Sequence, residues 1–87
     1  NDELEGEFKI LNKGNNQFEV SLTNTNSYED LNLDIYNMGG QRLLWKTLKN
    51  TSGFYSHTLD MSYASKGIYL IRLGHDKSST VKKIVVE

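Results

Sequence analysis

The chain has 87 residues, no cysteine and a net charge of -1. At this length about 60 to 65% of the unfolded chain's surface becomes buried on folding, which allows one domain with one small core. The lack of cysteine excludes disulfide bonds and thiolate metal sites, and the scattered basic residues without a recognised motif argue against nucleic-acid binding.

The charges are divided unevenly along the chain. Residues 1–40 carry eight acidic and two basic residues, whereas residues 41–87 carry three acidic and eight basic residues. Attraction between neighbouring strands explains this more simply than a basic binding surface. The acidic start lacks the positive region of a signal peptide, and no apolar run approaches the roughly 20 residues that span a bilayer. If the protein is exported, its export signal would lie on a longer precursor or in this segment itself.

The first elements form a strand, a turn and a second strand. Residues 7–11 alternate partly, and residues 12–16 are a polar cluster with a glycine, which predicts a turn. Residues 17–23 alternate strictly between apolar and polar side chains, which predicts a half-buried strand. Its apolar face consists of Phe18, Val20 and Leu22.

A hairpin is predicted in the middle of the chain. Residues 31–35 alternate as a third strand, and Gly39-Gly40 separates them from another apolar-rich segment, residues 41–48. Two glycines suit a two-residue type I′ turn, in which both central residues need a positive φ. The alternation does not decide whether Leu44 or Trp45 faces the core.

Three further strands follow. Residues 55–59 place Tyr55, His57 and Leu59 on one face. Residues 68–73 are the most apolar segment and are therefore expected at the centre of a sheet, and residues 79–86 form a last strand rich in β-branched side chains. Seven strands without a helical period predict an all-β fold, an antiparallel immunoglobulin-like β-sandwich.

No metal, cofactor or nucleophile site is expected from the residue pattern. The two histidines, His57 and His75, have no third ligand at a suitable spacing, and the eight serines and six threonines include no nucleophile elbow. Carboxylates that could serve acid-base catalysis fall in polar or outward-facing contexts, where a raised pKa is not expected. These are Glu3, Glu5, Glu7, Asp30 and Asp34. We therefore expect no enzymatic activity.

Aromatic side chains outside the expected core offer an alternative function. They could form a stacking platform for sugars, which would make the chain a carbohydrate-binding or adhesive module appended to a surface enzyme. The candidates are Trp45, Tyr28, Tyr36 and Tyr63. Packing in the core or at an interface is the simpler interpretation of the same residues.

Three segments together carry a family resemblance. They are residues 33–41 (LDIYNMGGQ), 65–73 (SKGIYLIRL) and 81–86 (VKKIVV). In this order the chain resembles a C-terminal sorting domain of the type IX (Por) secretion system, of the type A kind. One departure is the lack of the Asn-Pro pair that the family usually has between its first two strands, since the chain contains no proline.

The resemblance implies that residues 7–87 form the sorting domain and that residues 1–6 are a linker from an upstream, covalently linked passenger. An outer-membrane translocon would recognise the domain after the protein has crossed the periplasm, and a sortase-like peptidase would remove it. The passenger would then reach the cell surface or the extracellular space. No cofactor, nucleic acid or transmembrane segment is implied.

The resemblance also places the recognition elements on residues of this chain. The family's Gly-x-Tyr element falls on Gly67 and Tyr69. The alternative is that these two residues serve only the folding of the domain. Its basic and then aliphatic terminal element falls on the last strand, at Lys82, Lys83, Ile84, Val85 and Val86.

Overall fold

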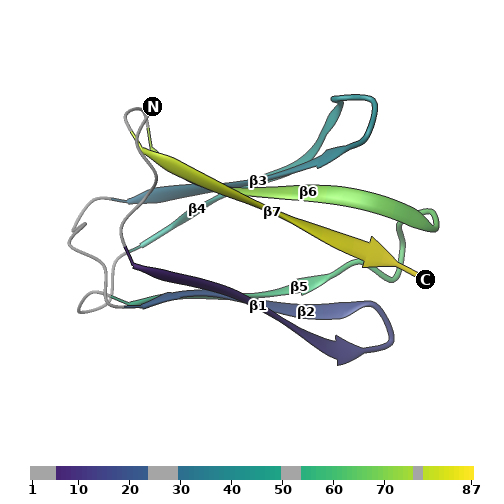
Figure 1. Ribbon diagram of the computed structural model, residues 1–87, viewed down its shortest axis with the longest axis horizontal. Helices are drawn as coiled ribbons and strands as arrows, with labels where there is room; N and C mark the ends of the chain where they lie inside the picture. Colours follow the sequence, from purple (N-terminus) through teal and green to yellow (C-terminus); the bar gives the residue numbers. More distant parts are fainter. Residues whose placement is uncertain (1–5, 24–29, 50–53, 76–77) are drawn as a thin grey trace.

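The computed structural model describes residues 6–23, 30–49, 54–75 and 78–87, which contain seven strands and no helix (Figure 1). The strands are β1 (Glu7–Gly14), β2 (Gln17–Thr23), β3 (Leu31–Asn37), β4 (Arg42–Leu48), β5 (Tyr55–Asp60), β6 (Gly67–Gly74) and β7 (Ser79–Val86). All strand pairs are antiparallel.

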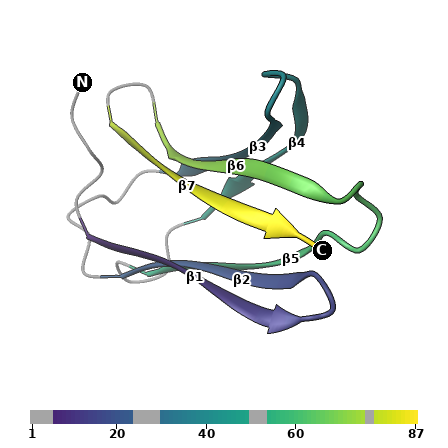
Figure 2. The ribbon, with the colours of Figure 1, turned by 45° about the vertical axis from the view of Figure 1, so that its right-hand side comes forward.

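The strands form two sheets that pack face to face, as Figures 1 and 2 show. One sheet has the order β1-β2-β5 and the other the order β4-β3-β6-β7. In immunoglobulin terms these are strands A, B and E facing strands C, F and G, with β4 beside β3 as C′ lies beside C. The predicted all-β antiparallel sandwich is therefore confirmed, as is the central position of β6.

The core fills the space between the sheets. It contains the predicted inward-facing residues of β2 and β3 and, from the predicted face of β5, Tyr55 and Leu59, whereas His57 is half-buried. Burial of each large apolar side chain stabilises the fold by roughly 1.5–3 kcal/mol. The ambiguity on β4 is resolved, because Leu44 packs against the core while Trp45 is 63% exposed on the outer face. The buried apolar residues are Phe18, Val20, Leu22, Leu31, Leu33, Ile35, Leu48, Tyr55, Leu59, Met61, Tyr69, Ile71, Leu73, Ile84 and Val86.

The two-residue turn lies in a different hairpin from the one predicted. Asn15 and Asn16, between β1 and β2, have φ of 54° and 60°, as a type I′ turn requires. The β3–β4 hairpin is confirmed, but the type I′ turn at Gly39-Gly40 is wrong, because only Gly40 has a positive φ.

A three-residue loop closes the β3–β4 hairpin instead. The Asn37 N–H donates to the Gln41 carbonyl oxygen and the Gly40 N–H to the Asn37 carbonyl oxygen, each at 3.0 Å. The Asn37 Oδ1 accepts from the N–H groups of Gly39 and Gln41, also at 3.0 Å. This side chain therefore accepts two of the N–H groups at the loop, and a bulge that leaves Leu43 unpaired takes up the extra residue.

Candidate recognition site on the terminal strand

β7 alternates between a buried and an exposed side. Ile84 and Val86 are 5% and 1% exposed, and they lie opposite Tyr69 and Gly67 on β6. The two elements that the family resemblance singled out are therefore brought together across neighbouring strands. The next residues along β7 point the other way, because side chains of a strand alternate between its faces, and Val85 is 48% exposed.

The two lysines of the terminal element point in different directions. Lys82 lies opposite the buried Ile71, but because β7 is an edge strand its long side chain can extend outward, and its ammonium group lies 5.9 Å from the centre of the Phe8 ring on β1. Lys83 lies opposite Leu70 on the outer face of the sheet. One positive charge thus lies at the gap between the sheets and the other on the exposed face.

Gly67 and Tyr69 each have a role in the fold. Gly67 has a φ of 152°, and no atom lies within 4 Å of the position that a Cβ would take, so the backbone conformation and not lack of space favours glycine. Tyr69 is 6% exposed, and its hydroxyl donates to the Ser65 carbonyl oxygen at 2.6 Å. This contact has the geometry of the tyrosine corner of immunoglobulin-like domains. Recognition of these two residues by a partner stays a prediction.

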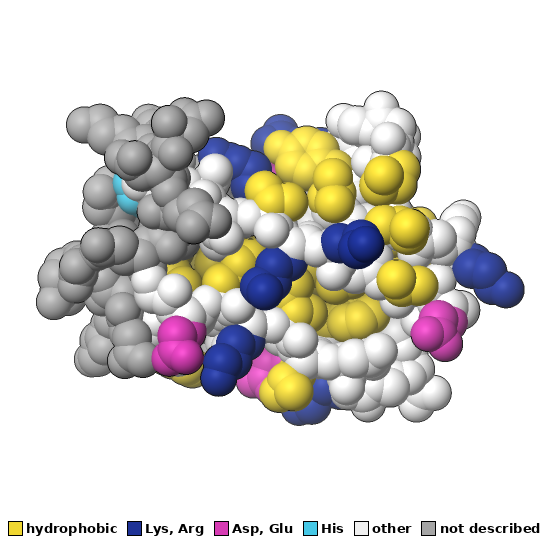
Figure 3. Space-filling view, viewed as in Figure 1, with side chains coloured by type: hydrophobic (Ala, Val, Ile, Leu, Met, Phe, Trp, Pro, Cys, Tyr) yellow, Lys and Arg dark blue, Asp and Glu magenta, His cyan; other side chains and the backbone are white. Residues whose placement is uncertain are grey.

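A groove runs between β1 and β7, the edge strands of the two sheets on one side of the sandwich. Its volume is about 260 Å³. In Figure 3, which shows this side, apolar side chains fill the gap and basic side chains lie across it. The lining residues are Ile10, Asn12, Phe18, Lys83, Ile84, Val85 and Glu87.

A pair of hydrogen bonds holds the end of the strand to the opposite sheet. The Asn16 Oδ1 accepts from the Glu87 N–H at 3.0 Å, and the Asn16 Nδ2 donates to the Glu87 carbonyl oxygen at 2.9 Å. The Asn16 carbonyl oxygen also accepts from the Met61 N–H at 2.9 Å. This role of Asn16 was not predicted, although an Asn-Asn pair between alternating segments is compatible with a type I′ turn.

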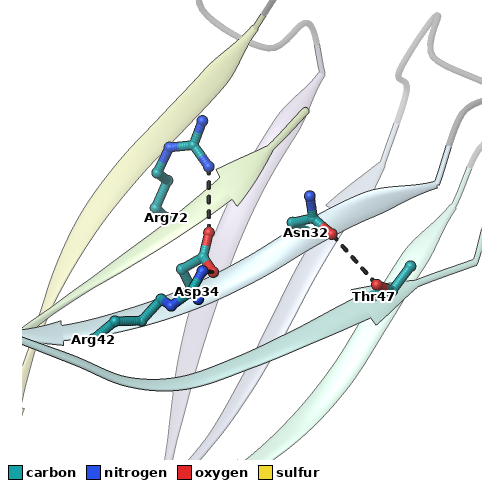
Figure 4. A network of polar contacts seen from close by, with 5 residues as sticks. All are labelled: Asn32, Asp34, Arg42, Thr47 and Arg72. Atoms are coloured by element: carbon teal, nitrogen blue, oxygen red, sulfur yellow. Dashed lines mark hydrogen bonds and ion pairs between the residues drawn. The ribbon is translucent and has the colours of Figure 1, made fainter. Parts of the chain in front are cut away.

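The outer face of the four-stranded sheet carries a charged cluster (Figure 4). The Asp34 carboxylate lies 3.3 Å from Nη1 of both Arg42 and Arg72, and its side chain is only 6% exposed. Asp34 points outward, as expected from the alternation, and its side chain is nevertheless almost fully buried. The flanking side chains cover it, and the Arg42 guanidinium in turn lies 4.5 Å from the centre of the Trp45 ring.

The aromatic residues of the alternative function lie on different elements. Trp45 is on β4 with one ring face covered by Arg42, Tyr36 is half-buried on β3, and Tyr63 is 66% exposed between β5 and β6. Tyr28 falls outside the described residues. Sugar binding by this set stays a prediction.

The described residues contain no group of three or more histidine, aspartate or glutamate side chains placed to hold a metal ion. Partial burial, followed by the charge of Lys46, lowers the pKa of His57 from its ordinary value. In the described part of the chain, no helix is long and apolar enough to cross a membrane.

Comparison with known proteins agrees with this geometry. A search among curated proteins gives no match. A family model described as a secretion system C-terminal sorting domain matches residues 12–87, which include all seven predicted recognition residues. Since this match covers most of the sequence, the chain belongs to the family of type IX secretion system C-terminal sorting domains.

Proposed function

We propose that the domain is a non-catalytic sorting signal that directs an upstream passenger protein across the outer membrane by type IX secretion. Residues 1–6 would be the linker to this passenger, and a sortase-like peptidase would remove the domain at the cell surface. The match of the sorting-domain family over residues 12–87 is the observation that carries the proposal. Family membership implies export to the cell surface or the extracellular space.

We infer that the predicted recognition residues divide into two roles. Lys82, Lys83 and Val85 are exposed and would contact the translocon. The remaining four would act indirectly, because they hold the terminal strand in the sandwich: Gly67, Tyr69, Ile84 and Val86. For Tyr69, Ile84 and Val86 the division follows from burial, since a translocon that recognises the folded domain can reach only exposed side chains. Gly67 joins this group because of its backbone conformation.

The shape of the sandwich supports separate places for cleavage and recognition. Its longest dimension is 35 Å. β1 begins at one end of this axis and β7 finishes at the other, as Figures 1 and 2 both show. A peptidase acting before Glu7 would therefore work far from a translocon that holds the end of β7.

A secretion assay tests the proposal. The chain is fused behind a reporter in a bacterium that has the machinery, and it is compared with a fusion that lacks residues 80–87. Because the deletion also removes Ile84 and Val86 from the core, a second variant, Lys82→Ser with Lys83→Ser, changes only exposed positions. Lys46→Ser with Lys49→Ser is the matched control, with the same change of charge on the distant edge strand β4 and the residue after it.

The expected result is that surface delivery falls strongly for the deletion and for the Lys82/Lys83 variant but not for the Lys46/Lys49 control. Equal delivery by the complete and the shortened fusion would remove the terminal strand from the mechanism. An equal loss of surface delivery in the two lysine variants would show that the machinery responds to net charge and not to the position of the charge on β7.

A further inference from the structure

We propose that β7 is recognised by strand addition. An extended segment of a partner protein pairs with the open edge of β7 at Val81, Lys83 and Val85. The biological identity of that partner rests on the proposed sorting function. β7 pairs with β6 alone among the described strands, and Figures 1 and 2 show it at the margin of its sheet. Edge strands present backbone N–H and C=O groups that can template another strand.

Two hydrogen bonds fix which backbone groups face this edge. In an antiparallel pair, the N–H and C=O of every second residue point to the partner and those of the residues between point away. The His75 N–H donates to the Ser78 carbonyl oxygen, so even-numbered residues of β7 bond to β6. Both backbone groups of Glu87 bond to the side chain of Asn16 on the other side of the strand. Both contacts therefore indicate that the backbone N–H and C=O groups of the odd-numbered residues of β7 face the open edge.

Asn16 limits the free part of this edge. Its amide already bonds to Glu87 as an added strand would, because it supplies one acceptor and one donor to the same residue. The stretch that remains for a partner strand ends at Val85. It offers three consecutive pairing residues, Val81, Lys83 and Val85, whose side chains lie on the outer face of the sheet.

Among the four edge strands of the described residues, β7 is also the longest one without a register shift. Its register with β6 runs without a shift through all eight residues. In contrast, β1 has a bulge that leaves Lys13 unpaired, and β4 has one that leaves Leu43 unpaired. The fourth edge strand, β5, has six residues. Because bulges and short length protect edges from pairing, β7 is the edge best suited to accept a strand.

The side chains along the edge indicate the chemistry of the partner. Val81 and Val85 are 52% and 48% exposed, and Lys83 lies between them on the same face. Ile68, which pairs with Val85, adds another side chain that is 40% exposed. Side chains directly opposite each other on paired strands interact, and opposite charges attract. The matching segment therefore alternates apolar, acidic and apolar side chains on one face.

A second copy of the domain matches this edge poorly. When two β7 strands pair antiparallel so that Val81 lies opposite Val85, Lys83 lies opposite the same lysine of the other copy. Like charges directly opposite each other destabilise a strand pair. The lysine thus disfavours self-association and favours a segment with an acidic residue at that position.

Proline substitutions separate backbone pairing from side-chain recognition. Proline removes one N–H and is tolerated on edge strands where that N–H faces solvent. Lys83→Pro removes an edge-facing N–H, whereas Lys83→Thr removes the charge and keeps the N–H. Lys82→Pro is the control for orientation, because the N–H of Lys82 bonds to β6. We expect Lys83→Pro to unfold near the wild-type temperature and Lys82→Pro to unfold at a clearly lower temperature.

The reporter fusion then measures delivery. We expect Lys83→Pro to lose at least about tenfold in surface delivery and Lys83→Thr to lose clearly less, because backbone pairing supplies most of the affinity in strand addition. Val81→Pro and Val85→Pro, which also remove edge-facing N–H groups, should repeat the loss. A folded Lys83→Pro variant that is delivered as well as wild type, or an equal loss in Lys83→Thr, overturns strand addition. Failure of the wild-type fusion to reach the surface overturns the proposed function instead.

A peptide probe tests the edge independently of secretion and does not depend on the proline variants folding. The probe is a blocked nine-residue peptide in which valine, glutamate and valine alternate with threonine. With the unmodified chain, it should slow amide hydrogen exchange at Val81, Lys83 and Val85 by at least about fivefold, since these amides gain partners. The same peptide with lysine in place of glutamate should protect them less. Unchanged exchange at these amides with millimolar peptide contradicts the proposal.

Discussion

Asn16 and Glu87, which are 71 positions apart in the sequence, are joined by two hydrogen bonds between the side-chain amide of Asn16 and the backbone of Glu87. Asn16 belongs to the turn of the β1–β2 hairpin, and Glu87 directly follows β7 in the other sheet. The pair therefore ties the terminal strand to the opposite layer of the sandwich. It positions the strand that we propose as the recognition element.

Removal of the Asn16 side chain should loosen the end of β7. Asn16→Gly keeps a residue that accepts the positive φ of 60° but deletes both hydrogen bonds, and we expect a loss of about 1–2 kcal/mol in the free energy of unfolding. Asn15→Gly is the matched control in the same turn and should change stability by less than about 0.5 kcal/mol. Urea unfolding measures both values. Equal stabilities of the two variants would contradict a role for the Asn16–Glu87 contact.

Tyr69→Phe should destabilise the domain although it keeps the aromatic ring. The substitution removes the hydrogen bond from the hydroxyl to the Ser65 carbonyl oxygen, which we expect to cost about 1–1.5 kcal/mol. Tyr63→Phe, at a position that is 66% exposed, is the control and should have almost no effect. Thermal unfolding of both variants checks the prediction. If Tyr69→Phe unfolds at the wild-type temperature, the hydrogen bond of the tyrosine corner does not contribute to stability.

The Asp34 cluster should contribute more than an ordinary surface ion pair. Asp34→Ala removes the carboxylate between Arg42 and Arg72, and we expect a loss of about 1–2 kcal/mol, between the values for exposed and fully buried pairs. Asp30→Ala breaks a solvent-exposed pair with Lys49 and should cost less than about 0.5 kcal/mol. Double-mutant cycles with Arg72→Ala measure the coupling. A coupling energy near zero would reduce the cluster to a surface contact.

Stability should fall as the pH is lowered through the titration range of His57. Its pKa in the folded state lies below the ordinary value of 6.5, because partial burial and then Lys46 disfavour the charged imidazole. The unfolded chain therefore binds more protons in the window between the folded pKa and 6.5, and the free energy of unfolding decreases as the pH falls through it.

Two variants test this origin of the pH dependence. His57→Gln should flatten the stability curve in that window, and Lys46→Gln should reduce its slope, because one of the two causes of the lowered pKa is removed. Urea unfolding between about pH 5 and 7.5 provides the data, above the range in which most carboxylates titrate. A slope that persists in His57→Gln would assign the dependence to other groups.

The local sequence patterns correctly predicted the seven strands and most of their buried faces. Strict alternation identified the inward faces of β2, β3 and β5, because one face of each strand must be buried. On β4 the run Leu43-Leu44-Trp45 breaks the alternation, and only the register with β3 shows that the bulge at Leu43 directs Leu44 inward. Single-strand patterns contain no information about a bulge in the pairing.

The long-range contacts could not be predicted from the sequence. Asp34 is covered because the neighbouring strands place Trp45 and Arg72 directly opposite it, which depends on the register of two strand pairs. The Asn16–Glu87 contact similarly depends on how the two sheets pack. The family pattern located the terminal element, but it did not reveal which of its residues are buried or that odd-numbered backbone groups face the open edge.

The most direct test of the sorting function is the delivery of an unrelated periplasmic reporter fused to the complete chain, in cells with and without a functional type IX translocon. Protease accessibility on intact cells measures the surface fraction. We predict that the reporter becomes accessible only when both the chain and the translocon are present. A reporter that remains in the periplasm of translocon-competent cells, or that reaches the surface without the translocon, would contradict the account.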